Sequence, residues 1–247
     1  MRWAFLLFAW ALAASSPAAS LAPDASPKPQ RILFIGNSLT YTGDIPGRLE
    51  KLASAMGRRA VVESVTSPGY SLEDHWQDGR AAAAIRRKGW DVVVLQQGTS
   101  ARHPDRSQLL DYTRRFATLI REAGAKPALY MVWPASDRTQ DFRAVISSHR
   151  EAAAAVDATI VPVGEAWLRA MAADKRVRLY GDAIHPGSLG VDLAVLTFYF
   201  TFFPAGHQEF DDAFVARLGR ALDLPADRRD VLVDAATRAI DEPMPLQ

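Results

Sequence analysis

A chain of 247 residues with 49% hydrophobic and 23% charged side chains has the composition of one globular domain with a substantial core. Its 29 lysines and arginines nearly balance its 28 acidic residues, so the charge predicts no nucleic-acid partner. The chain contains no cysteine, which excludes disulfide bonds as a source of its stability.

The N-terminal segment has the order of features of a secretory signal. Arg2 precedes an apolar run over residues 3–14, and small residues follow it. We therefore predict a signal peptide over residues 1–20 and an exported protein, periplasmic or extracellular. The apolar run is short for a membrane span, so we expect no stable span after signal removal, and an uncleaved anchor is the competing interpretation. Prolines in residues 21–30 predict an extended linker before a single domain over residues 31–247.

Short apolar runs alternate with amphipathic stretches along the rest of the chain. The runs predict buried strands and the stretches predict helices, a pattern typical of a parallel sheet covered by helices on both faces. Sheets of this kind bind ligands beside the carboxyl ends of their strands. The expected strands cover residues 32–35, 60–65, 91–95, 127–133 and 159–163, and the expected helices cover residues 45–56, 72–88, 107–123, 142–156, 165–173, 189–203, 211–222 and 228–240.

One helix and two side chains admit two interpretations each. The helix over residues 189–203 is apolar throughout, and its length favours a buried core helix over a membrane-associated one. Trp133 is the candidate for a cleft wall that stacks on a sugar or acyl group, although most tryptophans lie in a core or at its rim. His75 either lines a substrate cleft or belongs to a polar cluster at the start of a helix, and the second interpretation is favoured.

Two short motifs at opposite ends of the domain suggest chemistry. Ser38 follows the first strand directly, after a turn that Gly36 permits, and is a candidate nucleophile or an ordinary capping serine. Asp182 and His185 lie three residues apart in a loop that continues with Pro186. At that spacing a carboxylate can orient the imidazole while its other nitrogen faces a hydroxyl, which is the logic of a serine triad. The alternative is a capping aspartate beside a surface histidine.

Together these motifs resemble the SGNH/GDSL hydrolases. The four residues from Gly36 read Gly-Asn-Ser-Leu, like the first block of that family, and the five from Asp182 read Asp-Ala-Ile-His-Pro, like its last block, DxxHP. The resemblance covers residues 31–203. It implies a flavodoxin-like three-layer α/β/α sandwich with a five-stranded parallel sheet. It also implies ester hydrolysis with Ser38 as nucleophile, His185 as base and Asp182 as the residue that orients it.

The family builds an oxyanion hole from three donors, and here the sequence departs from its pattern. The backbone amides of Ser38 and Gly69 match the first two donors by position. The third is an Asn side chain in a GxND block, but this chain reads Gln-Gln-Gly-Thr-Ser from Gln96 onward. A Gln amide can donate the same hydrogen bond from a longer arm, so Gln97 is the first candidate and Gln96 the second.

Other kinds of site find no support in the sequence. It contains no H-E-x-x-H motif, no P-loop and no GxGxxG after a strand, so we predict no metal and no nucleotide cofactor. An α/β-hydrolase is disfavoured because Thr40 occupies the fifth position of the G-x-S-x-G elbow.

We therefore expect an exported serine esterase that cleaves short-acyl carboxylic esters of a small molecule or a glycan through an acyl-enzyme. Two alternatives stay open. One is an acyltransferase on the same triad, which differs only in its acceptor. The other is a non-catalytic carbohydrate-binding domain of the same fold, and the missing Asn is its best support.

Overall fold

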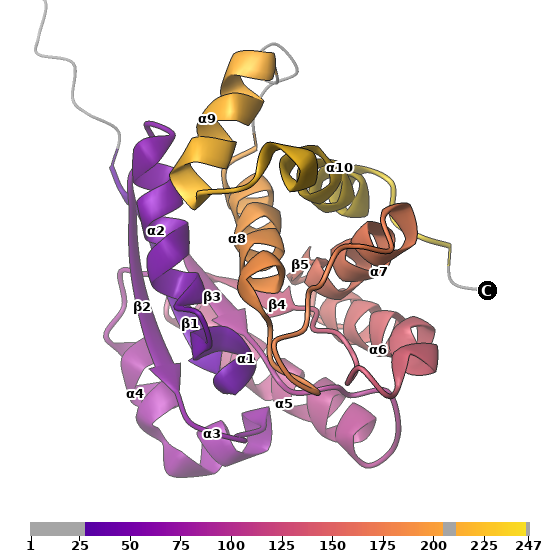
Figure 1. Ribbon diagram of the computed structural model, residues 1–247. Coiled ribbons are helices and arrows are strands. Elements are labelled where there is room, and N and C mark those ends of the chain that lie inside the picture. The colour runs from indigo at the N-terminus through magenta and orange to yellow at the C-terminus, as the bar shows by residue number, and fades with distance from the viewer. Residues whose placement is uncertain (1–27, 205–210, 246–247) are drawn as a thin grey trace, which may run out of the picture.

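The centre of the molecule is a five-stranded parallel sheet with the strand order β2-β1-β3-β4-β5 (Figure 1). The structure, a computed structural model, describes residues 28–204 and 211–245; the predicted signal peptide and most of the predicted linker lie outside the described residues. This strand order is that of flavodoxin-like folds, so the predicted fold class is confirmed. The strands are β1 (Gln30–Gly36), β2 (Ala60–Thr66), β3 (Val92–Leu95), β4 (Lys126–Tyr130) and β5 (Thr159–Val161).

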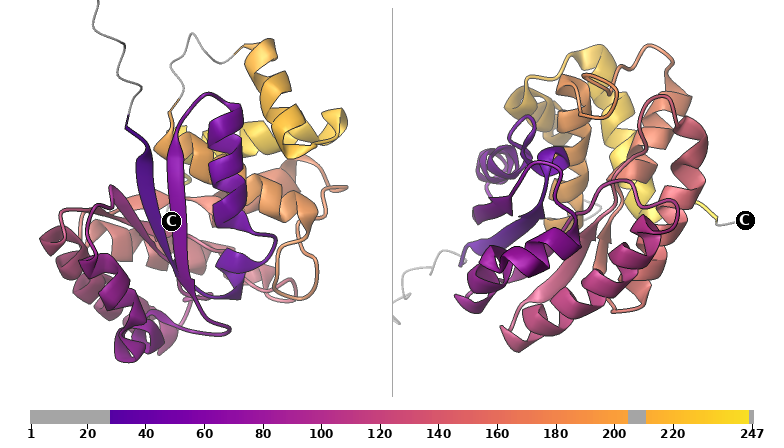
Figure 2. Two further views of the ribbon diagram at one scale, coloured as in Figure 1. Left: turned by 90° about the vertical axis from the view of Figure 1, so that its left-hand side faces the viewer. Right: turned by 90° about the horizontal axis from the view of Figure 1, so that it is seen from below.

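Alternation of side chains along the strands divides the apolar core into two halves. Ile32 and Phe34 face the first helix layer, and Leu33 and Ile35 face the second. The two layers lie on opposite faces of the sheet (Figures 1 and 2). The first layer contains α2 (Ile45–Ala55), α7 (Val163–Ala173), α8 (Ser188–Phe202), α9 (Asp212–Leu222) and α10 (Ala226–Asp241). The second contains α3 (Leu72–Asp78), α4 (Arg80–Arg86), α5 (Asp105–Glu122) and α6 (Phe142–Ala154).

Helix α8 lies against the middle of the sheet, which explains why its sequence is apolar on every side. The ring of Phe198 packs edge-on against Phe34 and Tyr130, with centroids 5.0 and 4.8 Å apart. The predicted buried core helix is thus confirmed. Of the helices in the described part of the chain, none combines the length and apolar character that crossing a bilayer requires.

Several boundaries differ from the sequence-based expectation for local reasons. The single helix expected over residues 72–88 is two helices, because Gly79 adopts a left-handed conformation (φ 81°) that ends α3. Ser38 begins one helical turn, α1 (Ser38–Tyr41), which the sequence did not predict. β1 begins at Gln30, which the sequence placed in the linker, and β4 ends at Tyr130, before Trp133.

Candidate active site

The turn that carries Ser38 is fixed by its neighbour Asn37. β1 ends at Gly36 and α1 begins at Ser38, and the Asn37 side chain caps this helical turn by accepting the amide hydrogen of Leu39 at 3.0 Å. The Asn37 Nδ2 donates to the carbonyl of Tyr70 at 2.9 Å, which ties the turn to the loop after β2. Ser38 therefore sits at the carboxyl edge of the sheet, half-buried, on a turn that the loop after β2 holds in place.

The loop over residues 180–187, which we name the triad loop, folds around the carboxylate of Asp182. Its Oδ1 accepts the backbone amides of Ile184 and His185 at 2.8 and 2.7 Å, and its Oδ2 accepts the His185 Nδ1 hydrogen at 2.8 Å. The two backbone amides, followed by the imidazole, lower the pKa of Asp182 to about 2. Asp182 is thus ionised at neutral pH and holds the His185 proton on Nδ1.

The two motifs meet in space, although 147 residues separate them in the chain. The Oγ of Ser38 lies 2.9 Å from the Nε2 of His185, with the serine hydroxyl donating to the unprotonated ring nitrogen. The His185 side chain is 34% exposed, so a ligand can reach this pair from solvent. The arrangement can transfer a proton from the serine hydroxyl to the imidazole as the oxygen attacks an electrophile.

A buried pair of stacked tryptophans, Trp133 and Trp167, holds the triad loop in position. The Trp133 indole donates its Nε1 hydrogen to the carbonyl of Ile184 at 2.9 Å and stacks on Trp167 at a centroid distance of 3.6 Å. Ser136 adds a second attachment through its amide hydrogen, which it donates to the Ala183 carbonyl at 2.8 Å. Trp133 is fully buried, so its expected role as a cleft wall is wrong. It orients the loop instead, because its indole N–H needs a partner when buried.

Gln96 lies beneath the turn that carries Ser38. Its Oε1 accepts the amide hydrogen of Asn37 at 2.7 Å and the hydroxyl of Thr40 at 2.8 Å. A Cβ at Gly36 would approach this oxygen to 2.4 Å, so only glycine fits between the strand end and the Gln96 side chain. Gln96 thus acts on the turn as an acceptor, and its Nε2 is buried without a hydrogen-bond partner in the described part of the chain.

Gln97 joins the loops that follow β2 and β3. Its Oε1 accepts the Leu72 amide at 3.1 Å, and its Nε2 donates to Ser100 Oγ and to the Asp105 carbonyl at 3.0 Å each. To serve as an oxyanion donor, Gln97 has to release one of these two bonds. The bond to Ser100 is the easier to release, because the Ser100 hydroxyl keeps its own bond to the Gly98 carbonyl.

A cavity of about 300 Å³ lies beside the triad. Asn37 and Ile184, which adjoin Ser38 and His185 in sequence, form one wall of it. Gly69, in the left-handed conformation (φ 70°), is part of the lining, as is Gln97, so both remaining oxyanion candidates face the same space. The other lining residues are Tyr70, Ser71, Gly98, Thr99, Ser100, Asp105 and Gln108.

His75 is a structural residue of the site, a role that neither interpretation of its sequence position predicted. It is 1% exposed, and its Nε2 donates to the Gly36 carbonyl at 2.8 Å, directly before the turn that carries Ser38. Burial lowers its pKa, so it stays neutral at pH 7. The polar cluster expected at this helix start is present as a capping box between Ser71 and Asp74, but His75 is not part of it. The three-residue spacing of His75 from the buried Leu72 was the signal that places it on the inner face of α3.

Comparisons with known proteins show which fold this is. No family model and no curated protein matches the sequence. Among solved structures, an SGNH hydrolase from Slackia heliotrinireducens is 24% identical, with a TM-score of 0.62, and the match covers 71% of this chain and all of the other. A DUF4886 family protein from Bacteroides uniformis is 17% identical, with a TM-score of 0.70 over 89% and 98% of the two chains. The acetyl xylan esterase AlAXEase is 14% identical, with a TM-score of 0.57 over 68% and 98%. The chain therefore has the fold of the SGNH/GDSL hydrolases. Separately, no potential metal-binding cluster of three or more acidic, His or Cys residues occurs in its described part.

Proposed function

We propose that this chain, which has an SGNH-type fold, is a serine hydrolase of carboxylic esters in the SGNH/GDSL family. The observation that carries the proposal is the 2.9 Å contact between Ser38 Oγ and His185 Nε2, with Asp182 on the other ring nitrogen. A capping serine and a surface histidine need no such contact across the fold. The geometry supports an enzyme over a non-catalytic carbohydrate-binding domain for the same reason.

In the proposed reaction His185 acts first as base and then as acid. Its Nε2 takes the Ser38 proton while Oγ attacks the ester carbonyl, and the amides of Ser38 and Gly69 with the Gln97 side chain stabilise the oxyanion. When the intermediate collapses, His185 gives the proton to the departing alcohol and an acyl-enzyme is left on Ser38. A water molecule, deprotonated by His185, then attacks the acyl carbonyl, and Ser38 recovers its proton as the carboxylic acid leaves.

The cavity beside the triad limits the substrate. About 300 Å³ accommodates a short acyl group or one sugar unit rather than a long alkyl chain. The acetyl xylan esterase among the structural neighbours supports a small acyl group on a carbohydrate. Export through the predicted signal over residues 1–20 places the enzyme where it meets such esters.

The decisive test is hydrolysis of p-nitrophenyl acetate by the mature chain and by Ser38→Ala. We expect the variant to lose at least about 10³-fold in kcat, because the nucleophile is gone while the binding groups stay. Ser54→Ala, an exposed serine on α2, is the matched control and keeps the wild-type rate. Labelling by a fluorophosphonate, mapped to the peptide that contains Ser38, identifies the nucleophile independently. Equal rates for wild type and Ser38→Ala remove Ser38 from the mechanism, and products formed with added sugars separate transfer from hydrolysis.

A further inference from the structure

A second concave site lies among the helices of the first layer, where α2 and α8 end and α9 packs beside them. Helix α2 begins just after the Ser38 turn, and α8 begins just after the triad loop; both run back toward the amino ends of the strands. At 1.5 Å per residue α2 spans about 16 Å, so the chain after its end is far from the nucleophile. Met56 and Arg58 follow α2, and Tyr199 lies near the end of α8, where they line a cavity of about 580 Å³ with residues of α9.

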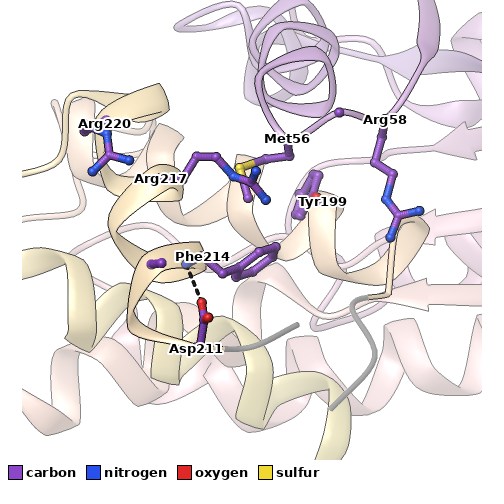
Figure 3. A pocket seen from close by; sticks show the side chains of 9 residues that line it. Met56, Arg58, Tyr199, Asp211, Phe214, Arg217 and Arg220 are labelled. Carbon is purple, nitrogen blue, oxygen red and sulfur yellow. Dashed lines mark hydrogen bonds between the residues drawn. The ribbon is translucent and has the colours of Figure 1, made fainter. Parts of the chain in front are cut away.

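This basic pocket, which we define by Met56, Arg58, Tyr199, Phe214, Arg217 and Arg220, has an apolar floor and a cationic rim (Figure 3). Met56, Tyr199 and Phe214 are buried, whereas the three arginines are exposed at its edge. Figure 3 shows the Arg217 guanidinium reaching toward Met56 and Tyr199. The volume is in the range of small-molecule sites, and the combination of floor and rim suits a ligand with both an apolar and an anionic part.

Two of the three arginines that line the pocket, Arg217 and Arg220, form no ion pair with a described residue. Asp211 is the acidic residue in the lining, and its carboxylate is engaged as the N-cap of α9, accepting the amide hydrogen of Phe214 at 2.8 Å. Among the described residues, neither Arg217 nor Arg220 lies within 4.0 Å of a carboxylate oxygen. Arg217 instead rests over the Phe214 ring at 5.9 Å, which keeps its guanidinium beside the apolar floor. The charges of Arg217 and Arg220 are therefore not used in ion pairs within the described part of the chain.

We propose that this pocket binds a phosphate ester, with the phosphate on Arg217 and the apolar part of the ligand on Met56, Tyr199 and Phe214. The planar guanidinium donates paired hydrogen bonds that match phosphate oxygens. Burial of apolar ligand surface against the floor adds to the binding free energy in proportion to its area. The phosphate belongs either to the headgroup of an anionic phospholipid or to a soluble phosphate ester. The site is independent of ester hydrolysis at Ser38.

The experiment measures binding of the mature chain to vesicles of phosphatidylglycerol in phosphatidylcholine, to vesicles of phosphatidylcholine alone, and to inorganic phosphate. The pocket variant is Arg217→Gln with Arg220→Gln. The matched control is Arg86→Gln with Arg143→Gln, which removes the same charge from exposed positions on α4 and α6. We expect the pocket variant to bind the anionic vesicles at least tenfold more weakly than wild type, and the control to bind within twofold.

The arms of this experiment also separate the two sources of phosphate. Preference for the anionic vesicles identifies a phospholipid headgroup, and binding of inorganic phosphate without vesicle binding identifies a soluble phosphate ester. Equal weakening in the pocket and control variants shows an unspecific effect of net charge and overturns the proposal, as does absence of binding in all three arms. Unchanged p-nitrophenyl acetate hydrolysis by the pocket variant verifies that it folds.

Discussion

The reactivity proposed for Ser38 depends on which nitrogen of His185 carries the proton. Asp182 decides this, because its ionised Oδ2 accepts the Nδ1 hydrogen and leaves Nε2 unprotonated toward the serine. The same carboxylate accepts two backbone amides of its own loop, so it also shapes the loop that carries the histidine. One side chain thus fixes the tautomer and the position of the base together.

The two glutamines after β3 hold different parts of the site, and their substitution distinguishes them. Gln97→Ala removes the side-chain donor that faces the cavity beside the triad, and we expect kcat for p-nitrophenyl acetate to fall about 10²- to 10³-fold. Gln96→Ala leaves the Asn37 amide and the Thr40 hydroxyl without their buried acceptor, which costs about 1–3 kcal/mol of unfolding free energy for each group. Steady-state kinetics and urea unfolding of both variants test this.

The comparison is informative in either direction. A Gln97→Ala enzyme with wild-type kcat contradicts the role of Gln97 as a donor. It shows that in the unmodified protein the Gln97 amide keeps its hydrogen bonds to Ser100 and Asp105 during the reaction, and that the oxyanion hole has only backbone donors. Gln97→Asn, with a shorter arm, serves as the conservative control and is expected to lose part of the activity.

At the scale of elements, α2 and α8 connect the two halves of the triad. Each helix begins within a few residues of a triad member, and Arg48 of α2 forms an ion pair with Asp192 in the first turns of α8. Val191 packs so closely on Gly43 that a Cβ at Gly43 would lie 2.4 Å from its side chain. The Arg48–Asp192 ion pair and the contact between Gly43 and Val191 join α2 to α8. They thereby fix the distance between the Ser38 turn, which precedes α2, and the triad loop, which precedes α8.

The Asp192 carboxyl predicts a specific dependence of stability on pH. Burial raises its pKa from 3.8 to about 6, against the attraction of Arg48, and the charge of Asp223 adds to the rise. The folded state then binds more protons than the unfolded state between these values, so stability falls as pH increases from about 4 to about 6. We expect the unfolding free energy of wild type, minus that of Asp192→Asn, to decrease over this range and to level off above it.

Urea unfolding at a series of pH values measures this difference. Asp137→Asn, at an exposed loop position, is the control and should give a flat difference. A difference that rises with pH instead shows that the attraction of Arg48 outweighs burial, and that the pair stabilises the ionised carboxylate.

At the scale of the whole molecule, acid lability is expected to come partly from a histidine far from the site. His149 of α6 is fully buried, donates from Nδ1 to the Val145 carbonyl at 2.8 Å, and has no partner for Nε2 in the described part of the chain. Burial lowers its pKa from 6.5 to about 4. Below pH 6.5 His149 takes up a proton in the unfolded chain but stays neutral in the folded chain. Stability is therefore lost as pH falls from about 6.5 to about 4.

We expect His149→Leu to remove this loss, so that wild type becomes less stable relative to the variant as pH falls through that range. Comparing the two proteins at each pH cancels the opposite contribution of Asp192. Thermal or urea unfolding provides the measurement, and His103→Gln, an exposed histidine, is the control. A constant difference from pH 7 to pH 4 contradicts burial of a neutral His149.

Local patterns were sufficient to predict most elements and the three triad candidates, and they were insufficient for the side chains around them. The continuous valines of β3 and the breakers after each strand act over a few residues, so the sequence displays them directly. Trp133, Gln96 and His75 were assigned wrongly or incompletely, because their roles depend on partners 51, 59 and 39 residues away. Periodicity along the chain carries no information about such partners.

The sequence by itself determined the layered α/β architecture and the residue types of a serine, histidine and aspartate triad, because strand and helix periods and short motifs are local properties. Only the tertiary structure decided that Ser38 and His185 are 2.9 Å apart, that two glutamines brace the loops, and that arginines from α9 and from the chain after α2 share a pocket. Each of these depends on how distant segments pack on the two faces of one sheet, and packing is a property of the whole chain.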